Sequence, residues 1–512
     1  MAIKTLRTCC LLHAMPGAFA HDRKVSGAAA QEGQPTSFSD ATVATPSSHA
    51  ASSNSCTFDL FERAVPSQWT VIRGGTVLTM DGRSVLPKHD VLIRDRIIRA
   101  VQLTGQPLPD GAVIVEAEGR FVMPGFSNVH AHPFLKTWAD AWKGSFLPDL
   151  DSSAVVLPYD LLMFQYLAAG VTRIEVMAGC ADILAVRAAI SADEIEGPRM
   201  QIGSPLIDGA PPIHSPLMSW IITDAEGGRK AARQILERGF DFAKPYSNLN
   251  REAYTALAEE CRALGIRIMG HVTPHVGIED AIMLGQGGIA HSAEYFYNET
   301  GNKRRDSAMF ARYAALAAER NIWTQATVTV SGIMEVILGK RPLRAPDSDL
   351  MHPLMKKLFA LDGDFAKMLQ GNPEKAYLGD DTFSLSCEIT AALRDAGAKI
   401  LTGVDEPNPY LVEGFSLHEE FENLVHEVGM SPIAVLEATT TMAAEYHGEN
   451  SNTGKIAPNM VADIVVLSGN PTQDISATRK IDTVLTRGTI LRRSSIEKGM
   501  ARIADRFRAM PI

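Results

Sequence analysis

FSNVHAH, residues 126–132, is a short apolar strand pattern that ends in two histidines. Seven more short apolar stretches follow it, and helical patterns separate them, for example at 224–237, 250–264 and 415–427. These further predicted strands are 171–177, 200–206, 240–246, 266–272, 287–292, 322–328 and 399–405. Eight strands that alternate with helices are typical of an α/β fold of the (β/α)8 or TIM-barrel type.

Stretches of a different kind flank this pattern. Alternating apolar positions with Gly-Gly and Asp-Gly turns begin at Trp69, and the same texture returns near the C-terminus in ADIVVLSGN and KIDTVLTRGTILRR. We therefore predict a small β-sandwich domain built from residues 67–124 and 455–495. The barrel domain would occupy 125–454, followed by a C-terminal tail at 496–512.

The long connection at 329–380 is either a cover for the active site or an inserted helical segment.

The N-terminal residues 1–66 are predicted to be a leader. Lys4 and Arg7 precede a weak apolar stretch and Ala18-Phe19-Ala20, which has the form of a signal-peptide cleavage site. Residues 21–55 are rich in Ala, Ser, Gly, Thr and Pro and have little to bury, which predicts disorder. We expect a periplasmic or secreted protein if this signal is real, and a cytoplasmic one otherwise.

Composition excludes several classes of function. The chain is 46% hydrophobic and 21% charged, which is ordinary for a globular protein. Its formal net charge is −10 and it has no basic run, so nucleic acid is not the expected partner. No apolar stretch approaches the ~20 residues that a membrane span needs. The cysteines form no CxxC pair, so neither a zinc ribbon nor a disulfide scaffold is indicated. Composition does little to identify a substrate.

Polar side chains gather where the predicted strands end. In a parallel barrel these ends form one rim, which is where function is expected. The side chains are His130, His132, Lys244, His271, His291 and Asp405. Histidines at positions i and i+2 of a strand point the same way, so His130 and His132 can bind one ion. The set as a whole predicts a metal site.

Lys244 is the unusual member of this set. It follows the apolar stretch 240–243, and no carboxylate is closer in sequence than Asp241. One interpretation is that the side chain reaches solvent from the strand end. The alternative starts from the fact that an ammonium group has no lone pair and cannot bind a cation. Nearby cations would favour the neutral amine, which can react with carbon dioxide to give a carbamate able to bridge two metals.

With these residues the chain resembles the amidohydrolase superfamily, and most closely its imidazolonepropionase-like and prolidase-like members with two metals and a carboxylated lysine. The resemblance runs from about Trp69 to Leu491. Its motifs are MPGFSNVHAHP, KPYSNLNREAY, GHVTPHVGIEDAI, IAHSAEY, LTGVDEPNP and ADIVVLSGNP. One departure is Ser127-Asn128-Val129, where the aspartate usual before the two histidines is missing.

The resemblance implies a role for each of these residues. His130, His132 and Asp405 would bind one divalent ion, His271 and His291 a second, and the carbamate on Lys244 would bridge them. A water or hydroxide shared by the ions would be the nucleophile. Asp405 would act first as general base and then as general acid. Zinc is the first choice of metal, although this donor set would also accept manganese, cobalt or iron.

Other side chains near the rim are weaker candidates. His214, His275 and Tyr295 are candidates for substrate binding, with a surface position as the alternative for His275. His418 is expected to support the site or pack a helix. Pro133-Phe134-Leu135 and Pro211-Pro212-Ile213 suggest apolar walls and a substrate with a hydrophobic group.

The expected function is therefore hydrolysis of an amide-type C–N bond in a small molecule such as an N-acyl amino acid or a dipeptide. The alternatives are a mononuclear deaminase, a lactone or ester hydrolase of the same superfamily, and a non-catalytic scaffold. By analogy with similar barrels we expect a homo-oligomer.

Overall fold

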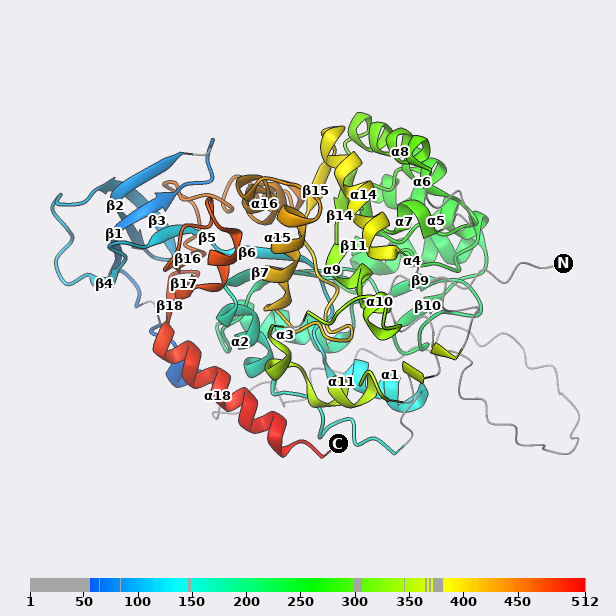
Figure 1. The fold of residues 1–512 in the computed structure, drawn as a ribbon, viewed down its shortest axis with the longest axis horizontal. Helices are drawn as coiled ribbons and strands as arrows, with labels where there is room; N and C mark the ends of the chain where they lie inside the picture. The colour runs from blue at the N-terminus through cyan, green and yellow to red at the C-terminus, as the bar shows by residue number, and fades with distance from the viewer. Residues whose placement is uncertain are drawn as a thin grey trace, which may run out of the picture.

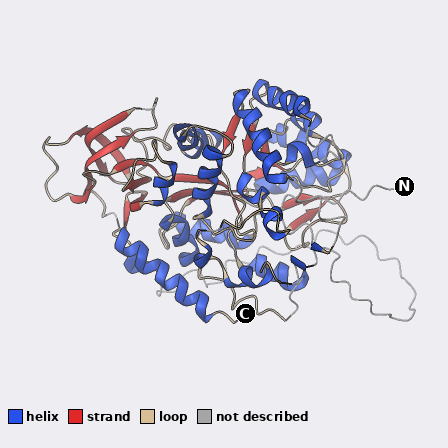
Figure 2. Ribbon diagram, in the orientation of Figure 1, coloured by secondary structure: helices blue, strands red, loops and turns tan. Residues whose placement is uncertain are grey.

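The computed structural model describes residues 56–511, with gaps at 64, 83, 146–148, 298–305, 345, 364–365, 368–369 and 372–380. The predicted signal peptide and most of the predicted leader lie outside the described residues. The chain has a mixed α/β fold, in which a β-rich end adjoins a larger body of strands and helices (Figures 1 and 2). None of the helices in the described part of the chain is long and apolar enough to span a membrane.

The β-rich end is one eight-stranded sheet assembled from both ends of the chain. Its strands are β1 (Trp69–Leu78), β2 (Val85–Arg94), β3 (Ile97–Leu103), β4 (Val113–Glu116), β5 (Phe121–Pro124), β16 (Ile464–Leu467), β17 (Ile481–Thr486) and β18 (Thr489–Arg492). Their order is β18-β17-β16-β5-β1-β2-β3, and β4 also pairs with β1. Antiparallel pairing of β5 with β16 joins the two ends of the chain. Alternate side chains, among them Ile72, Val91 and Ile464, form a separate apolar core.

Eight short parallel strands form the centre of the larger body. They are β6 (Phe126–Ala131), β7 (Val171–Val176), β8 (Arg199–Ile202), β11 (Phe242–Ala243), β12 (Arg267–Gly270), β13 (Gly288–Ala290), β14 (Trp323–Gln325) and β15 (Lys399–Leu401). They pair in chain order as sheets β6-β7-β8 and β11-β12-β13-β14-β15. Single parallel bridges, Gly203↔Phe242 and Ala131↔Glu406, join the two sheets at both of their edges. Each of the eight predicted strand segments overlaps one of these strands, and β8 begins one residue before its predicted segment.

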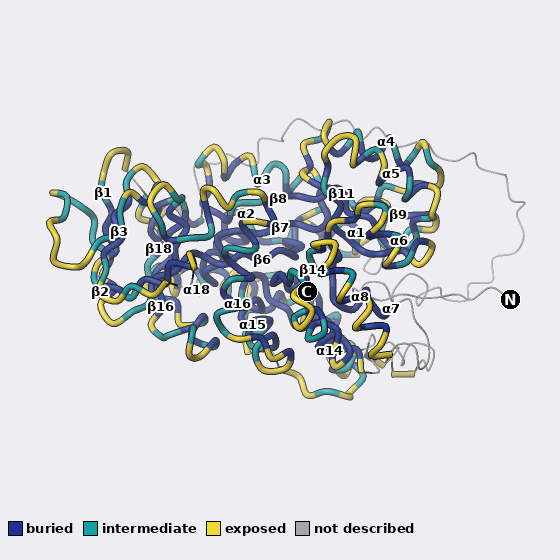
Figure 3. The backbone as a smooth tube through the Cα atoms, turned by 90° about the horizontal axis from the view of Figure 1, so that it is seen from above, coloured by how far each residue is buried: buried dark blue, intermediate teal, exposed yellow. Residues whose placement is uncertain are grey.

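Helices follow most of these strands and cover them from outside (Figure 1). They include α1 (Lys136–Ser145), α2 (Tyr159–Ala168), α3 (Ala181–Ser191), α4 (Ala225–Glu237), α5 (Arg251–Leu264), α6 (Ile278–Leu284), α7 (Glu294–Tyr297), α8 (Ser307–Glu319), α14 (Thr382–Asp395), α15 (Ser416–His426), α16 (Pro432–Thr439) and α17 (Thr441–Tyr446). Asp224 and Asn250 cap α4 and α5 with side-chain oxygens that accept backbone N–H groups. Because the strands are covered on both faces, they are buried, and exposed residues lie mainly on the outer helices and loops (Figure 3).

Sequence patterns did not predict the small parallel sheet of β9 (Leu206–Asp208) and β10 (Ser219–Ile221). Each strand has only three residues, too short for a periodic signal. A parallel bridge between Ile207 and Pro245 ties β9 to the segment after β11. This bridge brings the loop after β8 to the rim where Lys244 lies.

The described part of the 329–380 connection is largely helical. It contains α10 (Ile333–Ile337), the 3-10 turn η4 (Ser348–Leu350) and α11 (Pro353–Leu358), and α9 (Val328–Ser331) leads into it. Just before α11, Nε2 of His352 lies 2.7 Å from the carbonyl oxygen of Val155. The His352 ring packs 4.9 Å from the ring of Phe134, two residues beyond His132. The connection therefore rests against the segment that follows β6.

Both predicted chain-end boundaries differ from the structure. Residues 496–509 of the predicted tail belong to the helix α18 (Arg493–Ala509), which buries Ile496, Ile503 and Phe507. The predicted leader ends too late, because Leu60 and Phe61 are already buried in the core. Asp59 forms ion pairs with Lys498 and Arg502 of α18, at 2.5 and 2.7 Å. Apolar burial and these contacts hold residues 56–63 in place.

Candidate active site

The structure brings all six predicted metal-binding side chains to the same ends of the parallel strands. His130 is in β6 and His132 follows it, while Lys244, His271 and His291 come directly after β11, β12 and β13. Asp405 lies in the loop after β15. All six are buried, and the most exposed of them, His132, is only 6% accessible. The surface interpretation of Lys244 is wrong, because its side chain is 1% exposed.

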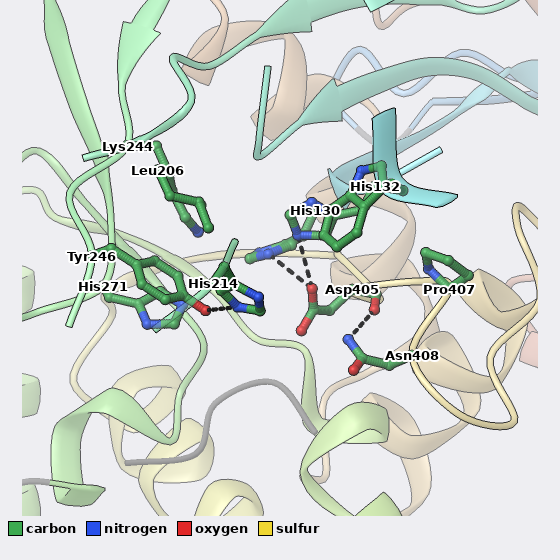
Figure 4. A pocket seen from close by; sticks show the side chains of 11 residues that line it. His130, His132, Leu206, His214, Lys244, Tyr246, His271, Asp405, Pro407 and Asn408 are labelled. Carbon is green, nitrogen blue, oxygen red and sulfur yellow. Dashed lines mark hydrogen bonds and ion pairs between the residues drawn. The ribbon is translucent and has the colours of Figure 1, made fainter. Parts of the chain in front are cut away.

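Five of the six line one pocket, which Figure 4 shows from close by. The pocket is lined by His130, His132, Trp138, Leu206, His214, Lys244, Tyr246, His271, Asp405, Pro407 and Asn408. The sixth, His291, lies beside it, with its ring centre 4.4 Å from that of His130 and 5.1 Å from that of His271. The pocket therefore combines a cluster of nitrogen and oxygen donors with a partly apolar wall.

Asp405 is the centre of the donor cluster. Its Oδ1 lies 3.3 Å from Nε2 of His130 and 3.1 Å from Nε2 of His132. Its Oδ2 lies 4.0 Å from Nε2 of His291. Ligand atoms of His130, His291 and Asp405 all lie within 4.8 Å of one another, which is compact enough for one ion. The carboxylate can thus reach ligands that come from two different strands.

The backbone at two of these residues is held in the left-handed region. φ is 70° at His291 and 68° at Asp405, a conformation that costs a non-glycine residue on the order of 1 kcal/mol. Neighbouring strands hold both residues there, since His291 N donates to Gln325 O at 2.9 Å and Asp405 N donates to His130 O at 2.8 Å. Such strain is found at functional sites more often than elsewhere.

The chemistry of the donors fits a bound cation. Burial lowers the pKa of His130 to about 4 and that of His291 well below its ordinary value, so both rings are neutral at neutral pH. Nδ1 of His130 lies 2.8 Å from Oε1 of Gln325, an oxygen that can only accept, so the ring hydrogen is on Nδ1. Nε2 of His130 therefore presents a lone pair 3.3 Å from Asp405 Oδ1. Two electron-pair donors this close suit a shared metal ion.

His271 is oriented by acceptors on its other nitrogen. Its Nδ1 lies 3.1 Å from Ser247 Oγ and 3.3 Å from Glu294 Oε1. Glu294 is itself fixed, because its Oε2 accepts a hydrogen bond from Val272 N at 2.8 Å. A carboxylate at Nδ1 leaves Nε2 as the ligand atom, an arrangement common in metal sites.

Lys244 points into the same cluster (Figure 4). Its backbone N–H donates to Ser204 Oγ at 3.1 Å, which holds the end of β11 against the segment after β8. Burial is the largest cause that lowers the pKa of His130 and of His291. The charge of Asp405 raises both pKa values, and the positive charge of Lys244 lowers both. The amine and the imidazoles therefore share one low-dielectric region.

Of the weaker candidate residues, one lines the pocket and the others lie outside it. His214 lines the pocket, and its Nε2 lies 2.9 Å from the hydroxyl of Tyr246. His275 lies in an exposed turn before α6 and is not among the lining residues. Tyr295 is buried in the core with its hydroxyl 2.9 Å from Thr324 Oγ1. His418 lies between Ala169 O and Thr478 Oγ1, which agrees with the alternative that it packs a helix.

Several pocket residues were missed from the sequence. Tyr246 lies two positions after Lys244, so the strand rule for i and i+2 could have found it. Asn408 had no signal of its own. The unusual Asn128 donates to Glu406 Oε1 at 2.7 Å and accepts from His130 N at 3.2 Å. It therefore ties β6 to the loop that carries Asp405.

Comparisons with known proteins identify the class. The sequence pattern of the amidohydrolase family matches residues 121–491, so this chain belongs to the amidohydrolase family, whose members are hydrolases that act on carbon–nitrogen bonds.

Similar solved structures agree on the fold. A Xaa-Pro dipeptidase with bound methionine is 17% identical, with 83% of this chain and 100% of that chain covered and a TM-score of 0.63. A putative prolidase from Bifidobacterium longum is 20% identical, with 86% and 100% covered and a TM-score of 0.61.

Among curated proteins the similarity is local. A 5-methylthioadenosine/S-adenosylhomocysteine deaminase from Symbiobacterium thermophilum is 40% identical over 75 residues, 14% of this chain. The match covers 17% of that protein's length.

Proposed function

We propose that this protein is a metal-dependent amidohydrolase that cleaves an amide-type C–N bond in a small molecule such as an N-acyl amino acid or a dipeptide. The observation that carries the proposal is the burial of Lys244 in the same cluster as four histidines and Asp405. A charged ammonium is costly to bury there, whereas a carbamate is an anion that could bind metal ions held by the neighbouring histidines and Asp405.

Each side chain of the cluster receives a role in this proposal. His130, His132 and Asp405 would hold one divalent ion, and His271 and His291 a second. Bound ions, with zinc as first choice, would polarise the scissile carbonyl and make water more acidic. The neutral Lys244 amine would attack carbon dioxide, form an N–C bond and release one proton, which leaves an anionic carbamate between the two sets of ligands.

Asp405 is proposed to move the proton. Its carboxylate lies 3.3 Å from His130 of β6 and 3.1 Å from His132 just after β6, and it lines the pocket. It would accept the proton of the attacking water and return it to the leaving nitrogen, so that the amine departs neutral. The buried surroundings support this role, because little solvent competes for the proton.

The rest of the pocket supports a substrate with an apolar group. Trp138, Leu206 and Pro407 supply apolar wall. His214 and Tyr246, whose Nε2 and hydroxyl oxygen lie 2.9 Å apart, add polar groups to the lining of this pocket. We propose that this pair binds a polar group of the substrate while the apolar residues hold its side chain.

The proposal includes the architecture around the site. The two parallel sheets and the bridges at both of their edges support a closed (β/α)8 barrel over residues 125–454. The eight-stranded sheet supports a flanking β-sandwich from 67–124 and 455–495, with its own core. Homo-oligomeric association remains part of the proposal.

Deamination is the second candidate, since the curated relatives with local similarity are deaminases. A panel of N-acyl amino acids, dipeptides and aminopurine nucleosides separates the two. We expect release of the amino acid from the amides, measured by primary-amine derivatisation, and no ammonia from the nucleosides. Ammonia release from nucleosides without amide cleavage would contradict the proposal.

A further inference from the structure

Gln325, the last residue of β14, lies in the interior between the strands, behind the candidate metal ligands. It is fully buried, and its carboxamide lies between His130 and Glu175. Oε1 is 2.8 Å from Nδ1 of His130, while Nε2 is 2.6 Å from the carbonyl oxygen of Val129 and 2.8 Å from Oε1 of Glu175. Both ends of the amide are therefore engaged.

These contacts leave only one orientation of the amide. The carbonyl oxygen of Val129 can only accept, so the amide nitrogen must face it. Oε1 of Glu175 also accepts from the hydroxyl of Tyr446 at 2.9 Å, which fixes the carboxylate from a second side. The oxygen of Gln325 is then left to face His130. An imidazole that binds a cation through one nitrogen carries its hydrogen on the other, and Gln325 accepts that hydrogen.

We propose that Gln325 is a positioning residue that holds His130 in the tautomer with Nε2 directed at Asp405, and that Glu175 and Tyr446 orient the Gln325 amide. This inference rests on the proposed metal site. A chain of hydrogen bonds thus runs from Tyr446 of α17 through Glu175 and Gln325 to His130. The ring of Tyr446 lies 5.5 Å from that of Trp323, at the start of β14. In the proposed assignment, His130 belongs to one set of ligands and His291 to the other, so this chain of hydrogen bonds would act on one set.

The contact of Gln325 with His130, and not with His291, can be tested directly. Thr327 makes the matching contact on the other side, with Oγ1 2.8 Å from Nδ1 of His291. Gln325→Met keeps the volume and removes the acceptor for His130, and Thr327→Ala removes the hydroxyl beside His291. Zinc affinity would be measured by chelator competition on metal-depleted protein for wild type and both variants.

We expect Gln325→Met to weaken one zinc equivalent by about 10- to 100-fold and to leave the other within about twofold. Thr327→Ala should weaken the other equivalent instead. Gln325→Asn, which keeps an amide but withdraws its oxygen by one methylene, should behave like Gln325→Met and serves if the methionine variant does not fold.

If both Gln325 variants bind zinc as tightly as wild type, or if both zinc equivalents weaken equally, Gln325 is not a positioning residue for His130. Either result would leave the proposed metal site unaffected. If wild-type protein binds no zinc, the result contradicts the proposed metal-dependent function as well.

Discussion

Nε2 of His132 lies 3.1 Å from Oδ1 of Asp405, although one residue follows β6 and the other follows β15. The parallel bridge between Ala131 and Glu406 lies beside this contact. The first and last of the parallel strands therefore meet at the site, and the carboxylate is placed by the same backbone pairing that joins the two sheets.

Replacement of Asp405 by asparagine tests its proposed proton transfer. We expect Asp405→Asn to lower kcat by about 10²- to 10⁴-fold, because an amide cannot accept the proton of water. Steady-state kinetics on an amide substrate measures this. The control is Asp395→Asn, an exposed carboxylate paired with Arg394, which should leave kcat unchanged. Full activity in Asp405→Asn would contradict the assignment.

Gly403 is required for close approach between β6 and the loop after β15. A Cβ at this position would lie 2.7 Å from Cβ of His130 and 3.0 Å from its backbone nitrogen. We expect Gly403→Ala to displace His130, to lower metal content and to reduce stability by about 1–3 kcal/mol. Gly287→Ala, where a Cβ meets no atom within 4 Å, is the matched control. Equal metal content in both variants would show that the approach is not needed.

The hydroxyl of Tyr246 is expected to contribute to substrate binding. Tyr246→Phe removes the contact with His214 and should lower kcat/KM by about tenfold, as expected for one lost hydrogen bond, while metal content stays unchanged. Tyr295→Phe is the control, because that hydroxyl bonds Thr324 in the core. A larger kinetic effect from Tyr295 than from Tyr246 would reverse the two roles.

Side chains at the ends of parallel strands could be predicted from the sequence. His130, His132, His271, His291 and Asp405 could be found because each closes a short apolar stretch, and parallel strands bring such ends together. Lys244 could be singled out because a charged side chain at the end of an apolar strand is unusual. Contacts between distant segments, such as Gln325 with His130, leave no periodic signal.

Some signals in the sequence were missed. In α18, Ile496, Met500, Ile503 and Phe507 follow helical spacing. Tyr295 was expected near the substrate because it follows His291, but the short helix α7 turns its hydroxyl toward Thr324 instead. Sequence proximity to a ligand does not determine which way a helical side chain points.

The folded protein is expected to lose stability in mild acid through His352. Burial lowers its pKa from 6.5 to about 4, so the unfolded chain takes up a proton in this window that the folded chain excludes. Stability therefore falls as pH drops from 6.5 toward 4. We expect wild type to lose about 2 kcal/mol more than His352→Gln between about pH 7.5 and about pH 5, measured by urea denaturation. Parallel pH profiles would contradict this.

Metal content of wild type beside Lys244→Ala, measured by plasma mass spectrometry on protein purified without chelator, tests the central claim most directly. Lys455→Ala is the control, since its Nζ pairs with Asp81 at 3.3 Å in the β-rich end. We expect about two divalent ions per chain in wild type and control, and a lower metal content in Lys244→Ala. One ion per chain that is unaffected by Lys244→Ala would contradict a carbamate-bridged pair and favour deamination.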